Sequence, residues 1–440
     1  MNDGTQSAST GELRLTAPWL SDPVLTSISV AFAAEGYSVR AVGGAVRDAL
    51  RVGLHGMPSR SGDIDLATDA RPADSVRVGE AAGYKVVPTG IDHGTVTLVS
   101  DRSSFEITTL RRDLETDGRH AVVSFTDDWA ADAARRDFTI NAIYADLDGA
   151  IFDPVGGLDD LVAGRLRFIG NADDRIREDY LRALRLFRFL AQFPDLTCDP
   201  LELASSTLAL NGIAKLSAER VRVELLKLLS APGAVPISSL LIAYGVYGVV
   251  LPTAPAIAAL ERVAKLCACF EGQTHTTHQQ STTKVNETFA IHALSALACR
   301  SCEDAERVAD KLKLSNAERQ QLRLTLRAEE LLGRQSGPDD IGWQVAVLET
   351  SASAVATAIA KRSADMTDDA SAIAAQRIAD VLAWPVPQFP LTGRDLIKAG
   401  YTPGRAVGDA LSQMRDIWIE SGFTSDKSEL LALLAKDSRE

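Results

Sequence analysis

The sequence is poor in the features that mark secreted and membrane proteins. It has only five cysteines in 440 residues, an odd number that favours a reducing compartment over a disulfide framework. It contains no run of about eighteen apolar residues, so we expect no membrane span and no membrane partner. The first fifteen residues lack the basic start and apolar centre of a signal peptide. We therefore expect a flexible tail over residues 1–17 and a cytoplasmic location.

Net positive charge is also missing. A formal net charge of −13 argues against a protein that coats nucleic acid, because binding to the phosphate backbone requires positive charge. The total hides the distribution, however, since residues 165–188 carry seven arginines against four acids. A local positive patch on an acidic protein is therefore available, and an enzyme that handles RNA is not excluded.

The pattern of the chain changes near residue 150. Before that point strand and helix signals alternate, and near-strict alternation in residues 95–99 and 105–110 predicts neighbouring strands. From Asp153 onward, amphipathic helical patterns take over. The sequence therefore predicts an α+β protein, in which a domain built on a mixed sheet precedes all-helical domains. Its length is sufficient for two to four domains.

The stretch Val-Gly-Gly-Ala-Val-Arg-Asp at 42–48 lies between a predicted strand and a predicted helix. Gly43 and Gly44 lack a Cβ, so the backbone there can approach a ligand closely. A helix that starts after such a turn presents free N–H groups to a phosphate. Arg47 adds a guanidinium to the same place. This stretch therefore predicts a phosphate site.

An acidic pair follows at Asp63 and Asp65. The strand period of two places both carboxylates on one face, where they repel each other unless a cation lies between them. Mg²⁺ prefers such oxygen ligands. Glu106, in a strand predicted nearby, is a candidate third carboxylate, although a surface acid in a cross-strand pair explains it equally well. Phosphate turn and acidic pair together predict a phosphoryl- or nucleotidyl-transfer centre.

Two adjacent arginines, Arg135 and Arg136, precede a run of alternating apolar residues. We expect their side chains to point in different directions, so that one meets phosphate and the other is structural. Asp137 and Asn141 are expected to hydrogen-bond locally and to fix the turn.

Residues 172–193 predict one amphipathic helix. Its charged side has two interpretations: a solvated face with ion pairs such as Glu178–Arg182, or a surface whose carboxylates and guanidiniums read the edge of a nucleobase. The residues concerned are Glu178, Asp179, Arg182, Arg185 and Arg188.

Four cysteines have a spacing that could close a zinc site, but their helical, alanine-rich context argues against it. The question stays open for Cys267, Cys269, Cys299 and Cys302.

These blocks, in this order, resemble the class II nucleotidyltransferases that add CCA to tRNA and their bacterial poly(A) polymerase relatives. The resemblance covers residues 39–229, with a weaker match over 391–422. It implies that Asp63 and Asp65 bind Mg²⁺ and that Arg136 binds the nucleotide. It further implies that Asp179 and Arg182 read the base. The remaining arginines, Arg185 and Arg188, would support the base readers or the triphosphate.

Residues 90–97 resemble the CCA-adding branch, and the Gly-Arg-Arg-Phe type of signature expected of poly(A) polymerases is absent there. Residues 111–120 resemble a flexible element of the CCA-adding enzymes, whereas the long gap over 51–62 departs from the family pattern. The domains implied are a catalytic head over 18–152, a neck with the base-reading helix over 153–230, a body over 231–335 and a tRNA-binding tail over 336–440.

The resemblance implies template-independent addition of CCA to the 3′ end of tRNA from CTP and ATP, without an obligate protein partner. One alternative is a poly(A) polymerase. Another is a non-catalytic RNA-binding relative, which the presence of both aspartates and all the arginines disfavours.

Overall fold

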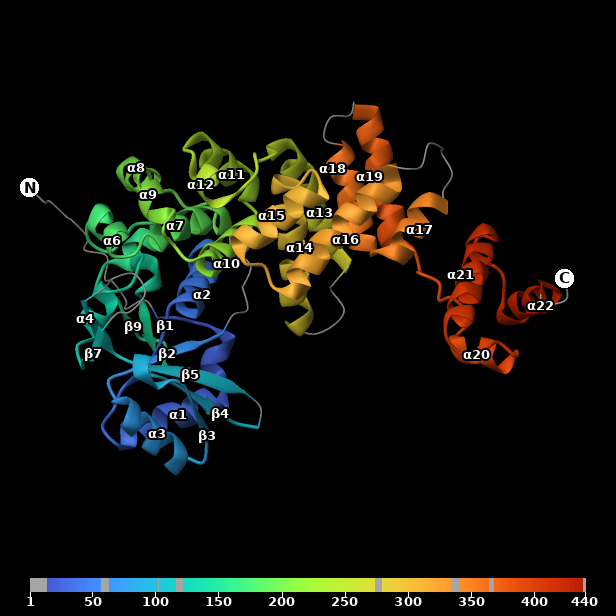
Figure 1. The fold of residues 1–440 in the computed structure, drawn as a ribbon. Coiled ribbons are helices and arrows are strands. Elements are labelled where there is room, and N and C mark those ends of the chain that lie inside the picture. The colour runs from blue at the N-terminus through green and yellow to red at the C-terminus, as the bar shows by residue number, and fades with distance from the viewer. Residues whose placement is uncertain are drawn as a thin grey trace, which may run out of the picture. The chain divides into compact units, whose positions relative to one another are not determined.

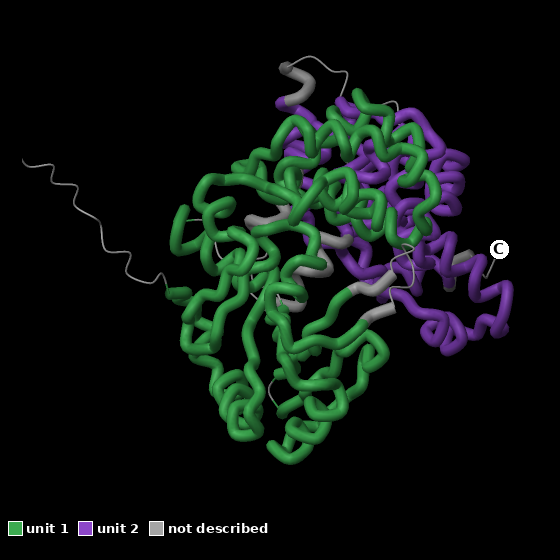
Figure 2. Tube along the Cα trace, turned by 90° about the vertical axis from the view of Figure 1, so that its left-hand side faces the viewer, with its two compact units in different colours: residues 1–250 green, residues 251–440 purple. Residues whose placement is uncertain are grey.

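The computed structural model describes residues 14–56, 63–101, 103–115, 122–273, 279–333, 341–363 and 368–437. Most of the predicted flexible tail, residues 1–13, lies outside these ranges. The chain divides into two compact units, Met1–Val250 and Leu251–Glu440 (Figure 2). This division falls inside the segment 231–335 that was predicted as the body, and the four-domain division stays a prediction.

Unit 1 is built on a mixed sheet of seven strands in the order β3-β4-β5-β2-β1-β8-β9 (Figure 1). Strands β2 and β5 pair in parallel, and the other neighbours in this sheet are antiparallel. A separate hairpin joins β6 and β7. The strands are β1 (Val39–Val42), β2 (Asp65–Thr68), β3 (Lys85–Gly90), β4 (Thr95–Val99), β5 (Ser104–Thr109), β6 (Arg111–Glu115), β7 (Val122–Phe125), β8 (Tyr144–Asp146) and β9 (Ile151–Phe152).

The predicted alternation of β4 and β5 is confirmed. Val96 and Leu98 of β4 are buried, as are Phe105 and Ile107 of β5, whereas the residues between them are partly or fully exposed. Such a pattern gives the sheet one face that packs on helices.

Helices α1 and α3 pack against the sheet, whereas α2 starts directly after β1 and runs toward the helices that follow the sheet (Figure 1). Helix α1 begins at Pro23 because Asp22 caps it, accepting a hydrogen bond from the N–H of Val24 at 2.8 Å. The helical elements of this part are η1 (Pro18–Ser21), α1 (Pro23–Ala34), α2 (Gly44–His55), α3 (Pro72–Ala81), η2 (Ile91–His93), α4 (Trp129–Ala134) and η3 (Thr139–Asn141).

After Phe152 the described residues form helices but no further strand, as predicted. Those of unit 1 are α5 (Gly157–Val162), α6 (Ala172–Glu178), α7 (Leu181–Gln192), α8 (Pro200–Leu208), α9 (Leu210–Ile213), α10 (Ala218–Leu229), α11 (Ala234–Ala243) and α12 (Val246–Val250).

The prediction of one continuous helix over 172–193 is wrong. The chain is extended at Asp179, with φ −153° and ψ 104°, and α7 starts afresh two residues later. The break is stabilised because the carboxylate of Asp179 accepts a hydrogen bond from the N–H of Leu181 at 3.1 Å.

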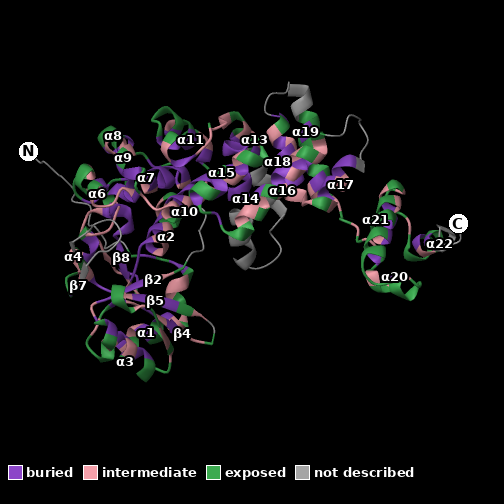
Figure 3. Ribbon diagram, in the orientation of Figure 1, coloured by how far each residue is buried: buried purple, intermediate pink, exposed green. Residues whose placement is uncertain are grey.

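Unit 2 is helical throughout its described residues. Its core is centred on the last three turns of α14, where residues 289–299 are all buried (Figure 3). A second apolar cluster joins the last helices around Met414 and Trp418. The helices are α13 (Ile257–Gln273), α14 (Gln279–Ala298), α15 (Cys302–Leu312), α16 (Asn316–Gly333), α17 (Ile341–Glu349), α18 (Ala352–Arg362), α19 (Asp368–Ala383), α20 (Gly393–Lys398), α21 (Arg405–Glu420) and α22 (Lys427–Asp437).

No helix in the described ranges of either unit combines the length and the apolar character needed to cross a bilayer.

Candidate active site

The glycine turn and the acidic pair meet at one edge of the sheet. Val42, the last residue of β1, pairs with Asp65, the first residue of β2. Gly43 caps α2 with φ 78° and ψ −131°, a conformation open to glycine but not to residues with a Cβ. A Cβ built on Gly43 would lie 3.9 Å from Oδ2 of Asp65. The turn therefore lies directly beside the carboxylate.

The three predicted carboxylates lie together. Asp65 is opposite Glu106 in the parallel register of β2 and β5, and Asp63 precedes it by two residues. Burial raises the pKa of Asp65. The guanidinium of Arg136 opposes this shift, but the nearby carboxylates of Glu106 and Asp63 add to it, and the pKa stays above its usual value. Like charges are therefore concentrated here, and a cation would relieve their repulsion.

The two carboxylates of Asp63 and Asp65 fit Mg²⁺ better than they fit a metal ion whose ligands all come from the protein. Across the described residues, no group of three or more histidine, cysteine, aspartate or glutamate side chains forms a ready metal cage. Mg²⁺ characteristically takes one or two carboxylates and completes its shell with substrate phosphates and water. The pair Asp63 and Asp65 meets that requirement.

Arg47 is buried at the start of α2 rather than extended into solvent. Its Nη1 donates to Oδ1 of Asn141 at 2.6 Å and its Nε to Oδ1 of Asp48 at 2.8 Å. The guanidinium also lies over the ring of Phe193, 4.7 Å from its centroid. Nη2 lies at the glycine turn, 3.7 Å from where a Cβ would stand on Gly44. Arg47 thus braces the turn and directs one nitrogen toward it.

Arg135 and Arg136 share one partner, so the prediction that they point in different directions is wrong. Nη2 of Arg135 lies 2.7 Å from Oδ1 of Asp132, and Nη2 of Arg136 lies 3.1 Å from Oδ2 of the same carboxylate. The reason is the helical spacing at the end of α4, which brings residues three and four positions after Asp132 onto one side. The local role predicted for Asp137 is confirmed, because its Oδ1 accepts from the N–H of Phe138.

Asp132 is the shared hydrogen-bond acceptor of this region, and it is only 1% exposed. Besides both arginines, it accepts hydrogen bonds from the hydroxyl of Tyr144 at 2.7 Å and from the N–H of Arg111 at 3.2 Å. Burial raises the pKa of Asp132, but Arg136 and Arg135 lower it further, and it lies below its usual value. The ionised carboxylate therefore fixes Arg136 beside the acidic cluster.

The charged residues at the α6–α7 junction form internal ion pairs. Oε2 of Glu178 accepts from Nη1 of Arg182 at 2.6 Å, which confirms the predicted i,i+4 pair, and also from Arg175. Nη2 of Arg175 donates to the carbonyls of Arg135 and Arg136, each at 2.7 Å. Arg175 therefore ties α6 to the arginine segment.

Asp179 contacts a helix far along the chain. Its Oδ2 accepts from Nη2 of Arg220, in α10, at 2.5 Å. Arg182, the second residue of α7, also donates to the carbonyl of Arg175 at 2.8 Å.

Arg185 and Arg188 point into the protein, against α10. Glu224, 4% exposed, accepts from Nε of Arg188 at 2.5 Å and from Nη1 of Arg185 at 3.3 Å. Arg185 also donates from Nε to Oδ2 of Asp137 at 2.7 Å. Burial lowers the pKa of Arg188, an effect that Glu224 opposes. These two arginines therefore act as braces between the arginine segment, α7 and α10.

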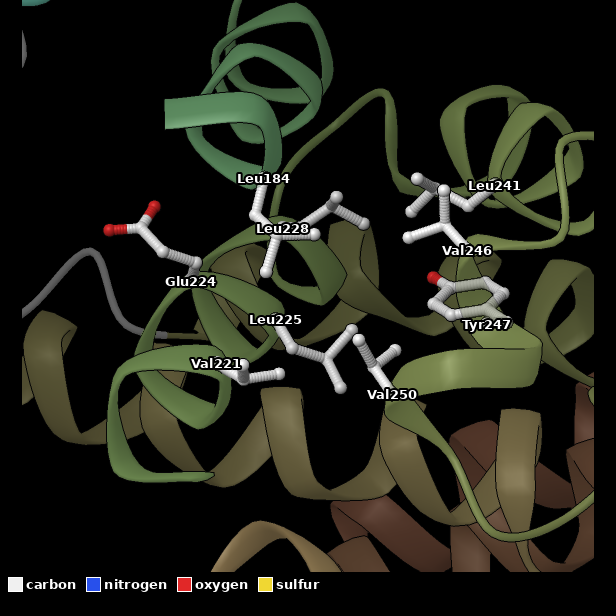
Figure 4. Close-up of a pocket in the computed structure, with 9 residues that line it drawn as sticks. All are labelled: Leu184, Val221, Glu224, Leu225, Leu228, Leu241, Val246, Tyr247 and Val250. Carbon is white, nitrogen blue, oxygen red and sulfur yellow. The ribbon is translucent and has the colours of Figure 1, made fainter. Parts of the chain in front are cut away.

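An apolar pocket lies behind this ion-pair cluster. Figure 4 shows the carboxylate of Glu224 directed away from the aliphatic side chains that line the pocket. Since the lining is otherwise aliphatic apart from one tyrosine, the pocket belongs to the packing of the helices. The lining residues are Leu184, Val221, Glu224, Leu225, Leu228, Leu241, Val246, Tyr247 and Val250.

The sequence interpretation missed four residues of this region: Asp132, Arg175, Arg220 and Glu224. Asp132 and Arg175 could have been found from a local signal, because each lies three residues before a predicted site residue, Arg135 and Glu178. Arg220 and Glu224 pair with residues 41 and 36 positions away, so their spacing carried no such signal.

Only two of the four candidate zinc ligands, Cys299 and Cys302, have side chains that the structure describes. Cys198, Cys299 and Cys302 carry free thiols, and Sγ of Cys302 lies 3.5 Å from Oε1 of Glu330. The side chains of Cys267 and Cys269 lie outside the described part of the chain. Residues 116–120 of the predicted flexible element and residues 57–62 of the lengthened gap also lie outside the described residues.

Comparison with known proteins agrees with this arrangement. The family described as "Poly A polymerase head domain" matches residues 39–167, and "Probable RNA and SrmB- binding site of polymerase A" matches residues 206–257. A Mus musculus protein named "CCA tRNA nucleotidyltransferase 1, mitochondrial" is 33% identical, over 94% of this chain and 90% of that protein. A Lactobacillus johnsonii CCA-adding enzyme is 38% identical over 48% of this chain and 50% of its own. The crystal structure of the Bacillus stearothermophilus CCA-adding enzyme in complex with CTP has a TM-score of 0.65 and 26% identity, covering 96% of this chain and 98% of that one.

Proposed function

The chain belongs to the family of CCA tRNA nucleotidyltransferases, and we propose that it adds C, C and A in turn to the 3′ end of tRNA, using CTP and ATP and releasing pyrophosphate. One observation carries the proposal: the glycine turn, the acidic pair and Arg136 converge at one sheet edge in a chain that aligns with a CCA transferase along 94% of its length.

The chemical half of the centre lies in the head. Asp63 and Asp65 would hold Mg²⁺, which when bound lowers the pKa of the tRNA 3′-hydroxyl and neutralises charge at the α-phosphate. Glu106 adds a third carboxylate beside Asp65. The N–H groups after Gly43, together with Nη2 of Arg47, would hold the triphosphate.

Arg136 contributes to the same binding as a fixed cation. Its guanidinium is oriented by Asp132 and Tyr144, so little side-chain entropy remains to be lost when a phosphate binds.

The selective half lies at the α6–α7 junction. Cytosine and adenine both present an exocyclic amine beside a ring-nitrogen acceptor, whereas uracil and guanine present a carbonyl beside a ring N–H. An ionised carboxylate only accepts and a guanidinium only donates, so Asp179 and Arg182 complement C and A but not U and G. Glu178 orients Arg182, and Arg185 and Arg188 hold α7 against α10.

We extend the proposal to the domains and the partner. Catalysis would occupy the head (18–152) and base selection the neck (153–230), while the body (231–335) and the tail (336–440) would hold the tRNA.

The proposed location is the cytoplasm. The free thiols of Cys198, Cys299 and Cys302 fit a reducing compartment. Because the Mus musculus relative is named as mitochondrial, cell fractionation followed by immunoblotting of this chain is the deciding measurement.

Single-nucleotide incorporation tests the function. With tRNA that lacks its last three nucleotides, we expect CTP alone to add two residues and ATP to add one residue only after them. Long A-only tails on unrelated RNA would instead identify a poly(A) polymerase. Asp63→Ala should abolish incorporation, because it removes a metal ligand. It should leave tRNA binding intact, because it does not change the body and the tail that we propose hold the tRNA. Near-normal turnover of that variant would refute the metal assignment.

A further inference from the structure

We propose that Arg220 and Gly212 are positioning residues that set the base selectivity of the centre by holding the bend at Asp179 and Tyr180. This inference rests on the proposed function, because it concerns the residues that we expect to read the base. Neither residue needs to touch the nucleotide.

The carboxylate of Asp179 is held at both oxygens. Oδ1 accepts from the N–H of Leu181 at 3.1 Å, and Oδ2 accepts from Nη2 of Arg220 at 2.5 Å. The first bond belongs to the start of α7, and the second comes from α10, a helix 41 residues away along the chain. Two bonds from different elements fix both the position and the plane of the carboxylate. Since each carboxylate oxygen has two acceptor sites, Asp179 can still accept from a base amine.

The residue after Asp179 is fixed by a close contact. A Cβ built on Gly212 of α9 would lie 2.0 Å from Cδ1 and 2.1 Å from Cε1 of Tyr180. The ring of Tyr180 therefore rests directly on the backbone at Gly212, which no larger residue allows without displacing the ring. The bend between α6 and α7 is thus held by Arg220 on one residue and by Gly212 on the next.

The consequence is selectivity. The hydrogen-bonding edges of C and A differ from those of U and G only in the placement of single donors and acceptors. The carboxylate of Asp179 must therefore be held rigidly to distinguish them. Without Arg220, Asp179 keeps one bond and can rotate about its side-chain torsions. The centre would then bind CTP and ATP more weakly and reject UTP and GTP less well, while the metal-binding carboxylates remain in place.

The experiment is steady-state incorporation of each of the four nucleotides by Arg220→Gln in the full chain. Loss of a charged hydrogen bond that positions a reader corresponds to a rise in KM for CTP and ATP of roughly 10- to 100-fold, with kcat at saturation changed by less than about threefold. The preference for CTP over UTP should fall in the same range. Arg220→Lys, which keeps the charge, should recover part of this preference. The matched control is Arg177→Gln, which removes an exposed arginine paired with Asp174 and should behave as the wild type.

A second pair of variants tests the contact at Tyr180. Gly212→Ala should reduce the CTP preference as Arg220→Gln does, whereas Gly248→Ala should not, because a Cβ at Gly248 of α12 meets no atom within 4 Å. Circular dichroism melting of each variant separates displacement of the bend from general unfolding.

Asp179→Asn separates base reading by Asp179 from its positioning by Arg220. If it alters base preference and Arg220→Gln alters neither KM nor preference, the positioning role is refuted while base reading stands. If neither variant alters preference, base reading by Asp179 is itself refuted.

Discussion

Asp132→Asn tests the idea that one buried carboxylate organises Arg135 and Arg136. Asparagine keeps the shape of aspartate but replaces one acceptor oxygen with an NH₂ donor. In the wild type Oδ1 faces the N–H of Arg111 and the side chain of Arg135, and Oδ2 faces Arg136 and the hydroxyl of Tyr144. In either orientation, the new NH₂ group must face donors, and two guanidiniums lose their counter-ion.

The size of the effect follows from burial. Removing one partner of a fully buried ion pair costs about 3–5 kcal/mol, because it leaves an uncompensated charge. The side chains of Arg135 and Arg136 are 16% and 21% exposed, so water can partly solvate them after the change. We therefore expect a loss of roughly 2–4 kcal/mol in the local free energy of unfolding.

The assay is hydrogen exchange of the amides of β8, the strand that begins with Tyr144. A local assay is needed because the two compact units need not unfold together. The expected loss corresponds to exchange that is roughly 30- to 700-fold faster. The pKa of Asp132 is lowered in the folded chain, so its contribution is present above the unfolded value of about 3.9 and is lost only as the pH falls through the lower folded value. The difference between the variant and the wild type should therefore stay constant from pH 8 to pH 5.

Glu35→Gln is the control, since Glu35 forms an exposed pair with Arg77 and its replacement should leave the exchange of the β8 amides unchanged. If Asp132→Asn speeds the exchange of the β8 amides by less than about fivefold, the role of Asp132 in organising the two arginines is refuted.

Three further predictions concern other carboxylates. Asp65→Asn should abolish incorporation yet raise the melting temperature of the metal-free chain at neutral pH, because a raised folded-state pKa means that the ionised form destabilises the fold; a lower melting temperature would contradict the crowding of like charges. Glu224→Gln should cost about 3 kcal/mol in urea unfolding by leaving Arg188 without its carboxylate, and a loss below about 1 kcal/mol would contradict its burial. Burial raises the pKa of Glu202, which accepts from the N–H of Phe168, to about 7. Relative to Glu202→Gln, the wild type should therefore lose stability as the pH rises from 4.5 through 7, and a flat difference in melting temperature would refute this.

The chemical half of the site was largely predictable from the sequence because its signals are local. Period-two alternation placed β4 and β5, and the sequence around Gly43 implied a turn of the kind that the structure has. The proximity of Asp65 and Glu106, by contrast, depends on β2 and β5 pairing in parallel, which the alternation of neither strand specifies.

The selective half was less predictable because its contacts are long-range. Residues on both sides of Asp179 follow one helical pattern, so periodicity favoured a continuous helix. The break depends on Asp179, whose carboxylate accepts from the N–H of Leu181 at the start of α7 and is held by Arg220 from 41 residues away. Likewise, Arg188 is buried because Glu224 of α10 compensates its charge, and neither residue reveals the other in the sequence.

Sequencing the 3′ ends of product RNA tests the central claim most directly. A tRNA lacking its last three nucleotides would be incubated with this chain, Mg²⁺ and all four nucleotides at equal concentration. We expect product ends to extend by C, C and A in that order and then to stop. Tails of A alone, or ends that contain U or G at the frequency of C, would contradict it.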